Sequence, residues 1–166
     1  MIGTLIAVAT FTFVSPHRTG RIFVADGEPE FVRLAAEDLS SDVMRITGRR
    51  PAVVGGEGAA PGDIAVATRP DGRREACDAS VEGGVLRLTG SDPHGTMACV
   101  YSFIENRLGV DPLSFWNGVP YPKREVLSWD VAGFHEPSPC FAFRGVFIND
   151  EDSFCTGASR KVRAPC

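Results

Sequence analysis

The sequence predicts an α/β fold, in which a mixed β-sheet carries two main helices packed mostly on one face. Two amphipathic helical patterns, at 29–47 and 93–108, each come after a short apolar run with the character of a strand. Two further runs, at 79–81 and 85–88, flank Glu-Gly-Gly in the manner of a hairpin. Together these patterns predict a sheet of about five strands.

The first helical pattern has clear limits. A strand at 22–25 precedes it, Pro29 stands near its first position, and Gly48 is placed to end it. Residues 63–68 (DIAVAT) then form a strand with the near-continuous apolar character of a buried one. The predicted buried stripe of the helix consists of Val32, Ala35, Ala36, Leu39, Val43 and Ile46.

The second helical pattern begins after a polar turn. Asp92 is a good N-cap, because its carboxylate can accept hydrogen bonds from the free amides of the first turn. Pro93 falls at the first helical position, where its missing N–H costs nothing, and Gly109 is placed to end the helix. Three- and four-residue spacing predicts a buried face of Met97, Val100, Tyr101, Ile104 and Leu108.

Residues 2–14 are apolar but too short to span a bilayer as a helix. Phe11 and Phe13, alternating with threonine, favour a first β-strand. The alternative is a signal peptide, since Ala7-Val8-Ala9 has the small-residue form of a cleavage site, although no Lys or Arg precedes it. The strand interpretation is slightly favoured, and an extracellular location stays open.

Length, composition and charge limit the classes of function that the chain can have. A chain of 166 residues with 43% apolar and 23% charged residues suggests one domain, or one domain and the start of another. The formal charge of −4 gives no electrostatic argument for nucleic acid or for an anionic membrane. Homo-oligomerisation is left open by these numbers.

Neither the cysteines nor the histidines are spaced as a metal site. The five cysteines include no C-x-x-C pair, and Cys99, inside the second helix, is interpreted as a small buried hydrophobe. His17, His94 and His135 are far apart in sequence. The chain also lacks a phosphate-binding loop and a dinucleotide fingerprint, so we expect no metal and no cofactor.

The turn and helix at 90–108, which begin with GSDPHGT, and the later LGVDPLSFWNGVP resemble the N-terminal domain of glycoside hydrolase family 115, the xylan α-1,2-glucuronidases. The segment 22–51 resembles the strand and long helix that open that domain, and 144–152 (RGVFINDED) resembles the family's first barrel strand. Family 67 glucuronidases and hexosaminidases share the pattern more loosely. The family usually carries a basic side chain where His94 stands.

The resemblance implies a division of the chain. We expect an N-terminal α/β accessory domain at 11–135, a linker at 136–142, the first strand of an incomplete (β/α)₈ catalytic barrel at 143–152, and a disordered or foreign tail at 153–166. Only 18 residues come after Ile148, whereas a whole barrel needs about 250.

The resemblance also implies a function. Full-length relatives remove 4-O-methyl-glucuronic acid from glucuronoxylan, and their principal catalytic acid lies in the barrel that is missing here. Asn149, Asp150 and Glu151 correspond to sugar-contacting positions at the end of the first barrel strand. We therefore predict a fragment that is inactive alone.

Alternatives remain for both the site and the function. From spacing alone, residues 149–152 read more simply as a solvated turn. The chain could instead be a stand-alone carbohydrate-binding or interaction module, or a hexosaminidase-type accessory domain. Phe115, Trp116 and Tyr121, close together after the second helix, are expected to form an interdomain contact surface and only secondarily a sugar platform.

Overall fold

The computed structural model describes residues 10–130 and 133–144, except for the side chain of Phe115. The described elements come in the order β1 (Thr10–Ser15), β2 (Arg18–Thr19), β3 (Ile22–Val24), α1 (Glu30–Thr47), β4 (Val53–Gly55), β5 (Ile64–Thr68), β6 (Cys77–Glu82), β7 (Val85–Gly90), α2 (Pro93–Phe103), a π-helical turn (Ile104–Leu108), α3 (Ser114–Asn117), β8 (Leu127–Asp130) and β9 (Phe134–Glu136).

The main sheet is mixed, as predicted. Its strand order is β4-β3-β5-β7-β6-β9, with β4, β3, β5 and β7 parallel and the last two strands antiparallel to their neighbours. It has six strands where the sequence predicted about five. The unpredicted strands β4 and β9 are three residues each, too short to show a period.

A second sheet contains the predicted N-terminal strand. Its order is β2-β1-β8, all antiparallel. Phe11 and Phe13 of β1 are buried together with Leu127 of β8, so the strand interpretation is confirmed for residues 10–15. Residues 1–9, on which the signal-peptide alternative depends, lie outside the described residues.

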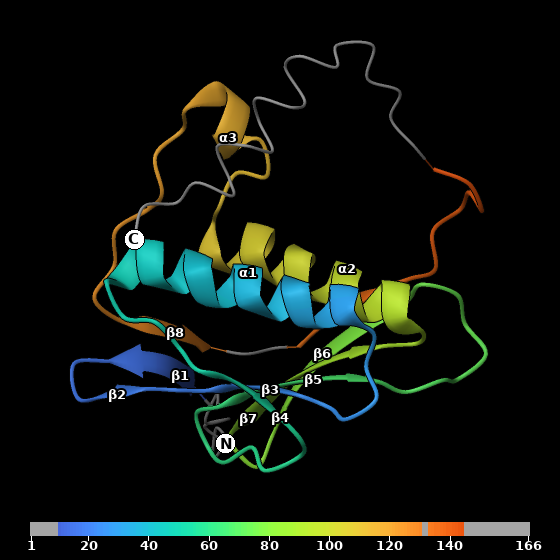
Figure 1. The fold of residues 1–166 in the computed structure, drawn as a ribbon, viewed down its shortest axis with the longest axis horizontal. Helices are drawn as coiled ribbons and strands as arrows, with labels where there is room; N and C mark the ends of the chain where they lie inside the picture. Colours follow the sequence, from blue (N-terminus) through green and yellow to red (C-terminus); the bar gives the residue numbers. More distant parts are fainter. Residues whose placement is uncertain (1–9, 131–132, 145–166) are drawn as a thin grey trace, which may run out of the picture.

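Helices α1 and α2 lie side by side on the same face of the sheets (Figure 1). All six residues of the predicted α1 stripe are buried, from Val32 to Ile46. Gly48 ends the helix with φ of 76°, a left-handed conformation that costs a side-chain-bearing residue energy. The predicted fold class is therefore confirmed.

The buried face predicted for 93–108 is confirmed at Val100, Ile104 and Leu108, but not at Tyr101, which is 42% exposed, or at Met97, which is only partly buried. Thr96, Cys99 and Phe103 are buried in addition. Thr96 and Cys99 are small, and a pattern of large apolar residues cannot reveal such contacts. The hydroxyl of Tyr101 instead donates to Asp38 of α1, at 2.8 Å.

Cys99 is buried as predicted, and it also forms a disulfide with Cys77, which the sequence did not predict. The bond joins α2 to β6, and the two Cα atoms lie 5.2 Å apart. The 22-residue separation hid the pairing at the sequence level, because nothing local indicates which cysteines meet. Cys140 is free and exposed, and Cys155 and Cys166 lie outside the described residues.

None of the described helices is both long and apolar enough to cross a membrane.

Candidate functional site

Strands β3, β5 and β7 run parallel and end on one side of the molecule, where α1 and α2 begin (Figure 1). We call this side the carboxyl edge, comprising residues 25–30, 68–76 and 90–96. The chain leaves β3 toward β4 on one side, and leaves β5 toward β7 on the other. Ligands of open α/β sheets bind at such a reversal of strand order, so this is the first place to look for a site.

A carboxylate of the chain itself occupies that position. Glu28 accepts from the backbone N–H of Thr68 at 2.5 Å and from its hydroxyl at 2.8 Å. The Thr68 hydroxyl lies 2.7 Å from the hydroxyl of Thr96, which is fully buried. These groups satisfy one another, so the carboxyl ends of β3 and β5 offer no open anion site.

The turn 90–96 (GSDPHGT), which carries the family resemblance, holds the carboxyl edge together. The carboxylate of Asp92 accepts from Gly95 N at 2.8 Å, which caps α2 as predicted, and from Glu75 N at 2.7 Å. The hydroxyl of Ser91 accepts from Ala76 N at 2.9 Å. One turn therefore caps a helix and fixes the neighbouring loop.

The charge on Asp92 is stabilised by these contacts. Burial alone would raise the pKa of its carboxyl, but the N–H groups of Gly95 and Glu75 and the charge of His94 together lower that pKa. Asp92 thus stays ionised and accepts both hydrogen bonds at neutral pH.

The two glycines of the turn allow close backbone contact. A Cβ on Gly90 would lie 2.0 Å from the backbone nitrogen of Thr96, and a Cβ on Gly95 would lie 2.5 Å from the carbonyl oxygen of Ala76. Neither obstacle is a flexible side-chain end. These glycines are therefore explained by packing and not by a ligand.

His94 is the one exposed residue of the turn 90–96. Its ring stacks on Phe31 of α1, with centroids 5.1 Å apart. The structure places this position on the surface, in the first turn of α2. Neither described cavity is lined by His94.

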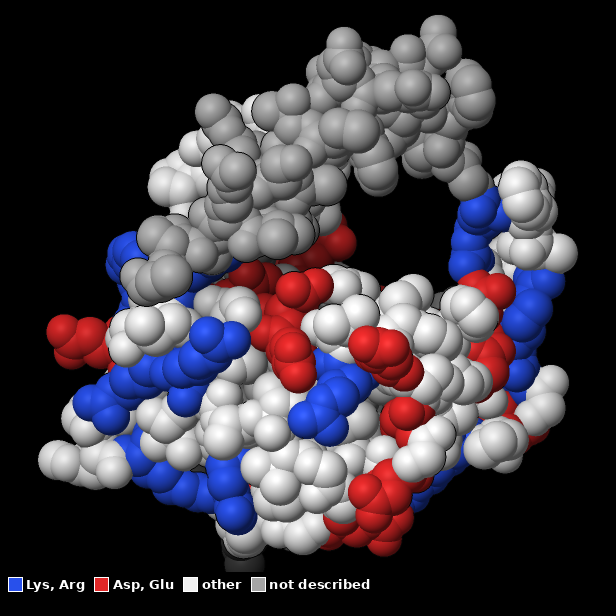
Figure 2. All heavy atoms as spheres, viewed as in Figure 1, with Lys and Arg blue, Asp and Glu red and all other residues white. Residues whose placement is uncertain are grey.

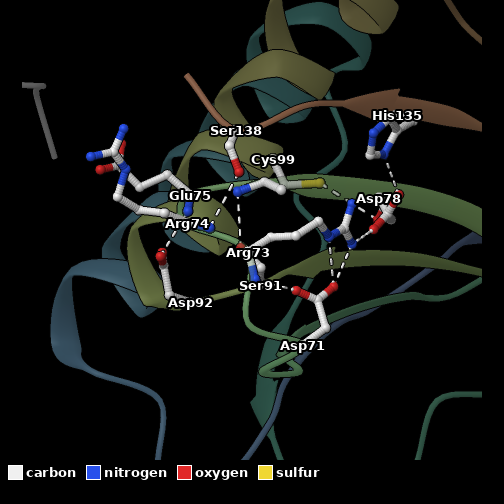
Figure 3. A network of polar contacts seen from close by, with 11 residues as sticks. Asp71, Arg73, Arg74, Glu75, Asp78, Ser91, Asp92, Cys99, His135 and Ser138 are labelled. Atoms are coloured by element: carbon white, nitrogen blue, oxygen red, sulfur yellow. Dashed lines mark hydrogen bonds and ion pairs between the residues drawn. The ribbon is translucent and has the colours of Figure 1, made fainter. Parts of the chain in front are cut away.

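The segment 134–144 runs back to the carboxyl edge. Figure 3 shows Ser138 above Arg74, whose backbone N–H donates to the Ser138 hydroxyl at 3.2 Å. The guanidinium of Arg74 donates to the carbonyl of Pro139 at 3.0 Å, and Arg144 forms an ion pair with Glu75. The adjacent loop residues Arg74 and Glu75 thus hold the segment 138–144 at separate points.

Strand β9 is fixed beside the same loop. His135 lies 2.5 Å from Asp78 of β6, and Arg73 bridges Asp78 and Asp71 (Figure 3). The hydrogen bond from Arg73 lowers the pKa of Asp78, and the contact with His135 lowers it by a smaller amount. The network is structural in character, because each charged group has an opposite partner.

The predicted sugar contacts Asn149, Asp150 and Glu151 lie outside the described residues. Of the predicted aromatic surface, Trp116 is 60% exposed, whereas the Tyr121 ring packs 5.0 Å from the guanidinium of Arg45. The described residues hold no group of three His, Cys, Asp or Glu side chains placed to bind a metal.

Two cavities lie away from the carboxyl edge. A space of about 20 Å³ is lined by aromatic residues of both sheets and α2, including Phe11, Phe103 and Trp129. An open groove of about 440 Å³ lies at the C-terminal end of α1, beside Lys123 and Arg124. The first can hold little more than one water molecule, and the second lacks the enclosure of a sugar-binding pocket.

Comparison with solved structures relates the fold to carbohydrate-active enzymes. Over 94% of its length the chain matches a novel family GH115 4-O-methyl-α-glucuronidase with specificity for decorated arabinogalactans, with 27% sequence identity and a TM-score of 0.66. The resemblance to glycoside hydrolase family 115 is confirmed. The chain spans 22% of the length of that enzyme.

Two further neighbours are also glycoside hydrolases. The GH20 β-N-acetylhexosaminidase from Streptomyces coelicolor A3(2) matches with a TM-score of 0.47 and 16% identity, covering 82% of this chain and 26% of its own. A GH138 enzyme targeting pectin rhamnogalacturonan II matches with a TM-score of 0.43 and 17% identity, covering 52% of this chain and 10% of its own. No protein-family model matches the sequence, and none of the curated proteins matches it.

Proposed function

We propose that residues 11–135 form the non-catalytic N-terminal domain of a family 115-like α-glucuronidase, and that this domain supports the catalytic barrel. One observation carries the proposal: the match to the family GH115 enzyme extends over 94% of the chain. The carboxyl edge agrees with it, since its polar groups bind one another and leave no open ligand site.

The substrate of the full-length enzyme is proposed to be a polysaccharide carrying 4-O-methyl-glucuronic acid. Glucuronoxylan is the substrate that the sequence motifs favour, whereas the family GH115 neighbour is specific for decorated arabinogalactans. On the side of the molecule seen in Figure 2, acidic and basic side chains both occur over the described residues. This mixed surface, like the formal charge of −4, gives no electrostatic argument for nucleic acid.

In this proposal residues 136–142 link the domain to the barrel, and Asn149, Asp150 and Glu151 contact the sugar once the barrel is complete. Glycoside hydrolysis usually needs two carboxyl groups on opposite sides of the bond, and one strand end supplies a single side of such a pocket. We therefore propose that the 166-residue chain is inactive by itself.

Release of 4-O-methyl-glucuronic acid tests this proposal. The purified chain is incubated with glucuronoxylan, with its aldouronic fragments and with a glucuronic-acid-decorated arabinogalactan, and the released acid is measured against a heat-killed control. No release is expected from any of them. Turnover above the control on one substrate would show that the chain carries a complete active site and is more than an accessory domain.

A second candidate, a stand-alone carbohydrate-binding module, is favoured by one observation only, the 60% exposure of Trp116 on α3. Sugar-binding surfaces generally combine aromatic rings with convergent polar groups. Val119, which is 45% exposed, and Leu113, which is 57% exposed, are the other large apolar side chains exposed in this region, beside the exposed Asn117. That composition suits contact with protein better than contact with sugar.

A further inference from the structure

Glu75 has an unusual backbone. Among the residues that the structure describes, it is the one non-glycine residue with a positive φ, of 50°. The left-handed region is unfavourable for a residue with a Cβ, so the surroundings must hold it there. They do so through Asp92, which accepts from Glu75 N, and through Ser91, whose hydroxyl accepts from Ala76 N and whose N–H donates to the Ala76 carbonyl.

This backbone conformation aims two neighbouring side chains at the departing chain. The Glu75 carboxylate pairs with Arg144, and the Arg74 guanidinium donates to the carbonyl of Pro139 at 3.0 Å. The Arg74 N–H adds a bond to Ser138. The side chain of Glu75 is only 21% exposed, so its carboxylate is partly shielded from the solvent that weakens surface ion pairs.

We infer that Arg74 and Glu75 are positioning residues that fix the direction in which the chain leaves this domain. The exit clasp consists of these two residues with Ser138, Pro139 and Arg144. The turn 90–96 supports the exit clasp, because three of its residues hold the strained backbone of Glu75 in place. These residues are Ser91, Asp92 and Gly95, which has no side chain. The inference rests on the proposed function in one respect, namely that the segment held in position is the start of the catalytic barrel.

Hydrogen exchange in the 166-residue chain tests the clasp. Glu75→Arg and Arg144→Glu each replace the ion pair with two like charges. Exchange of the amides in 134–140 should accelerate by about twofold to fivefold in each single variant, the range expected when a partly exposed ion pair is lost. Amides of α1 should exchange at unchanged rates. The double variant restores opposite charges and should return 134–140 toward the wild-type rate.

A matched pair controls for general charge effects. Arg33 and Glu37 form an exposed ion pair on α1 at 3.5 Å, far in sequence from the exit segment. Glu37→Arg removes that pair without touching the clasp, so exchange in 134–140 should not change. Unaltered exchange in both single variants, or a double variant that exchanges faster than either single one, would overturn the inference.

Glu75→Gly separates the carboxylate from the backbone. Glycine adopts positive φ without strain. If Glu75 served only the backbone turn, residues 134–140 in this variant would be held as firmly as in the wild type. We expect 134–140 to exchange faster in this variant although the domain is as stable as the wild type. If the amides in 134–140 exchanged at the wild-type rate in Glu75→Gly, Glu75 would serve only the turn, and its role in the exit clasp would be overturned. None of these outcomes depends on sugar chemistry, so the clasp and the proposed function can fail separately.

Discussion

Asp63 is buried, with 1% of its side chain exposed, and it ties the loop before β5 to the start of the domain. It pairs with Arg18 at 3.1 Å and Arg21 at 3.0 Å, and accepts from the backbone N–H groups of Arg21 and Ala60 at 3.0 Å each. Burial pushes the pKa of this carboxyl upward, but the hydrogen bonds from Arg21 and Ala60 and the charge of Arg21 outweigh it, so the pKa is lowered.

The lowered pKa makes Asp63 a source of pH-dependent stability. Its contribution is fully present above the unfolded-state value of about 3.9 and is lost as the pH falls through the lower folded-state pKa. Asp63→Asn should cost about 1–3 kcal/mol of unfolding free energy at pH 7, because a charge-assisted set of bonds becomes neutral. The difference between variant and wild type should shrink below about pH 4, which urea unfolding at several pH values measures.

The exposed Asp71 provides the matched control. Its pKa is also lowered, chiefly by the hydrogen bonds from Arg73, but 39% of its side chain is exposed. Asp71→Asn should therefore change stability far less than Asp63→Asn at pH 7. Equal effects of the two substitutions would show that burial of Asp63 is not what gives its bonds their strength.

Gly95 gives a prediction that opposes helix propensity. Alanine is a better helix former than glycine by up to about 1 kcal/mol, so propensity alone favours Gly95→Ala. The structure predicts the reverse, a loss of about 1–3 kcal/mol, because the new Cβ would lie 2.5 Å from the carbonyl of Ala76. Gly58→Ala is the control in urea unfolding, since its Cβ would meet only the Phe23 ring at 3.4 Å. A Gly95→Ala variant as stable as wild type would remove the packing explanation of this glycine.

At the scale of single residues, local bonds could be predicted and distant ones could not. The cap formed by Asp92 was predictable because its acceptor and Gly95 are three residues apart. The second bond of Asp92, to Glu75, and the ion pairs of Asp63 join residues 17 to 45 positions apart, and no local pattern marks them. The exit clasp was missed for the same reason.

At the scale of helices and strands, the disulfide between β6 and α2 was not predicted from the sequence, yet it should contribute substantially to the stability of the fold. A cross-link that closes a loop of this length stabilises a fold by about 3 kcal/mol, mainly by restricting the unfolded chain. The double variant Cys77→Ala, Cys99→Ala should lose about that amount in urea unfolding. Dithiothreitol should lower the stability of the wild type similarly, and leave the double variant unchanged. Equal stability of oxidised and reduced wild type would contradict the bond.

Long periodic elements were predicted well from the sequence. Of the three-residue strands, β3 was predicted from its apolar run, whereas β4 and β9 were not. Helix α1 runs over 30–47 against a prediction of 29–47, because eighteen residues show their apolar period clearly. The helix predicted at 93–108 consists of α2 at 93–103 and the π-helical turn at 104–108. Its buried face was predicted only in part, since Thr96 and Cys99 also face inward and neither is a large apolar residue. The three-residue strands β4 and β9 owe their existence to neighbours in the sheet.

At the scale of the whole molecule, we propose a domain that supports a catalytic barrel. Its parallel strands end where Glu28 binds Thr68, and the segment 138–144 is held at the same edge by Arg74 and Glu75. The family resemblance could be predicted from motifs, but the predicted sugar contacts Asn149, Asp150 and Glu151 stay predictions. The structure gives the turn 90–96 a structural explanation in six of its seven residues, all but His94.

Isothermal titration calorimetry separates an accessory domain from a binding module most directly. The 166-residue chain is titrated with xylo-oligosaccharides, with glucuronic acid and with aldouronic acids, alongside the variant Trp116→Ala. We expect no saturable heat for either protein, because the described residues offer no enclosed polar and aromatic pocket. Saturable binding in the micromolar range that disappears in Trp116→Ala would contradict it, and would identify α3 as a sugar-binding surface.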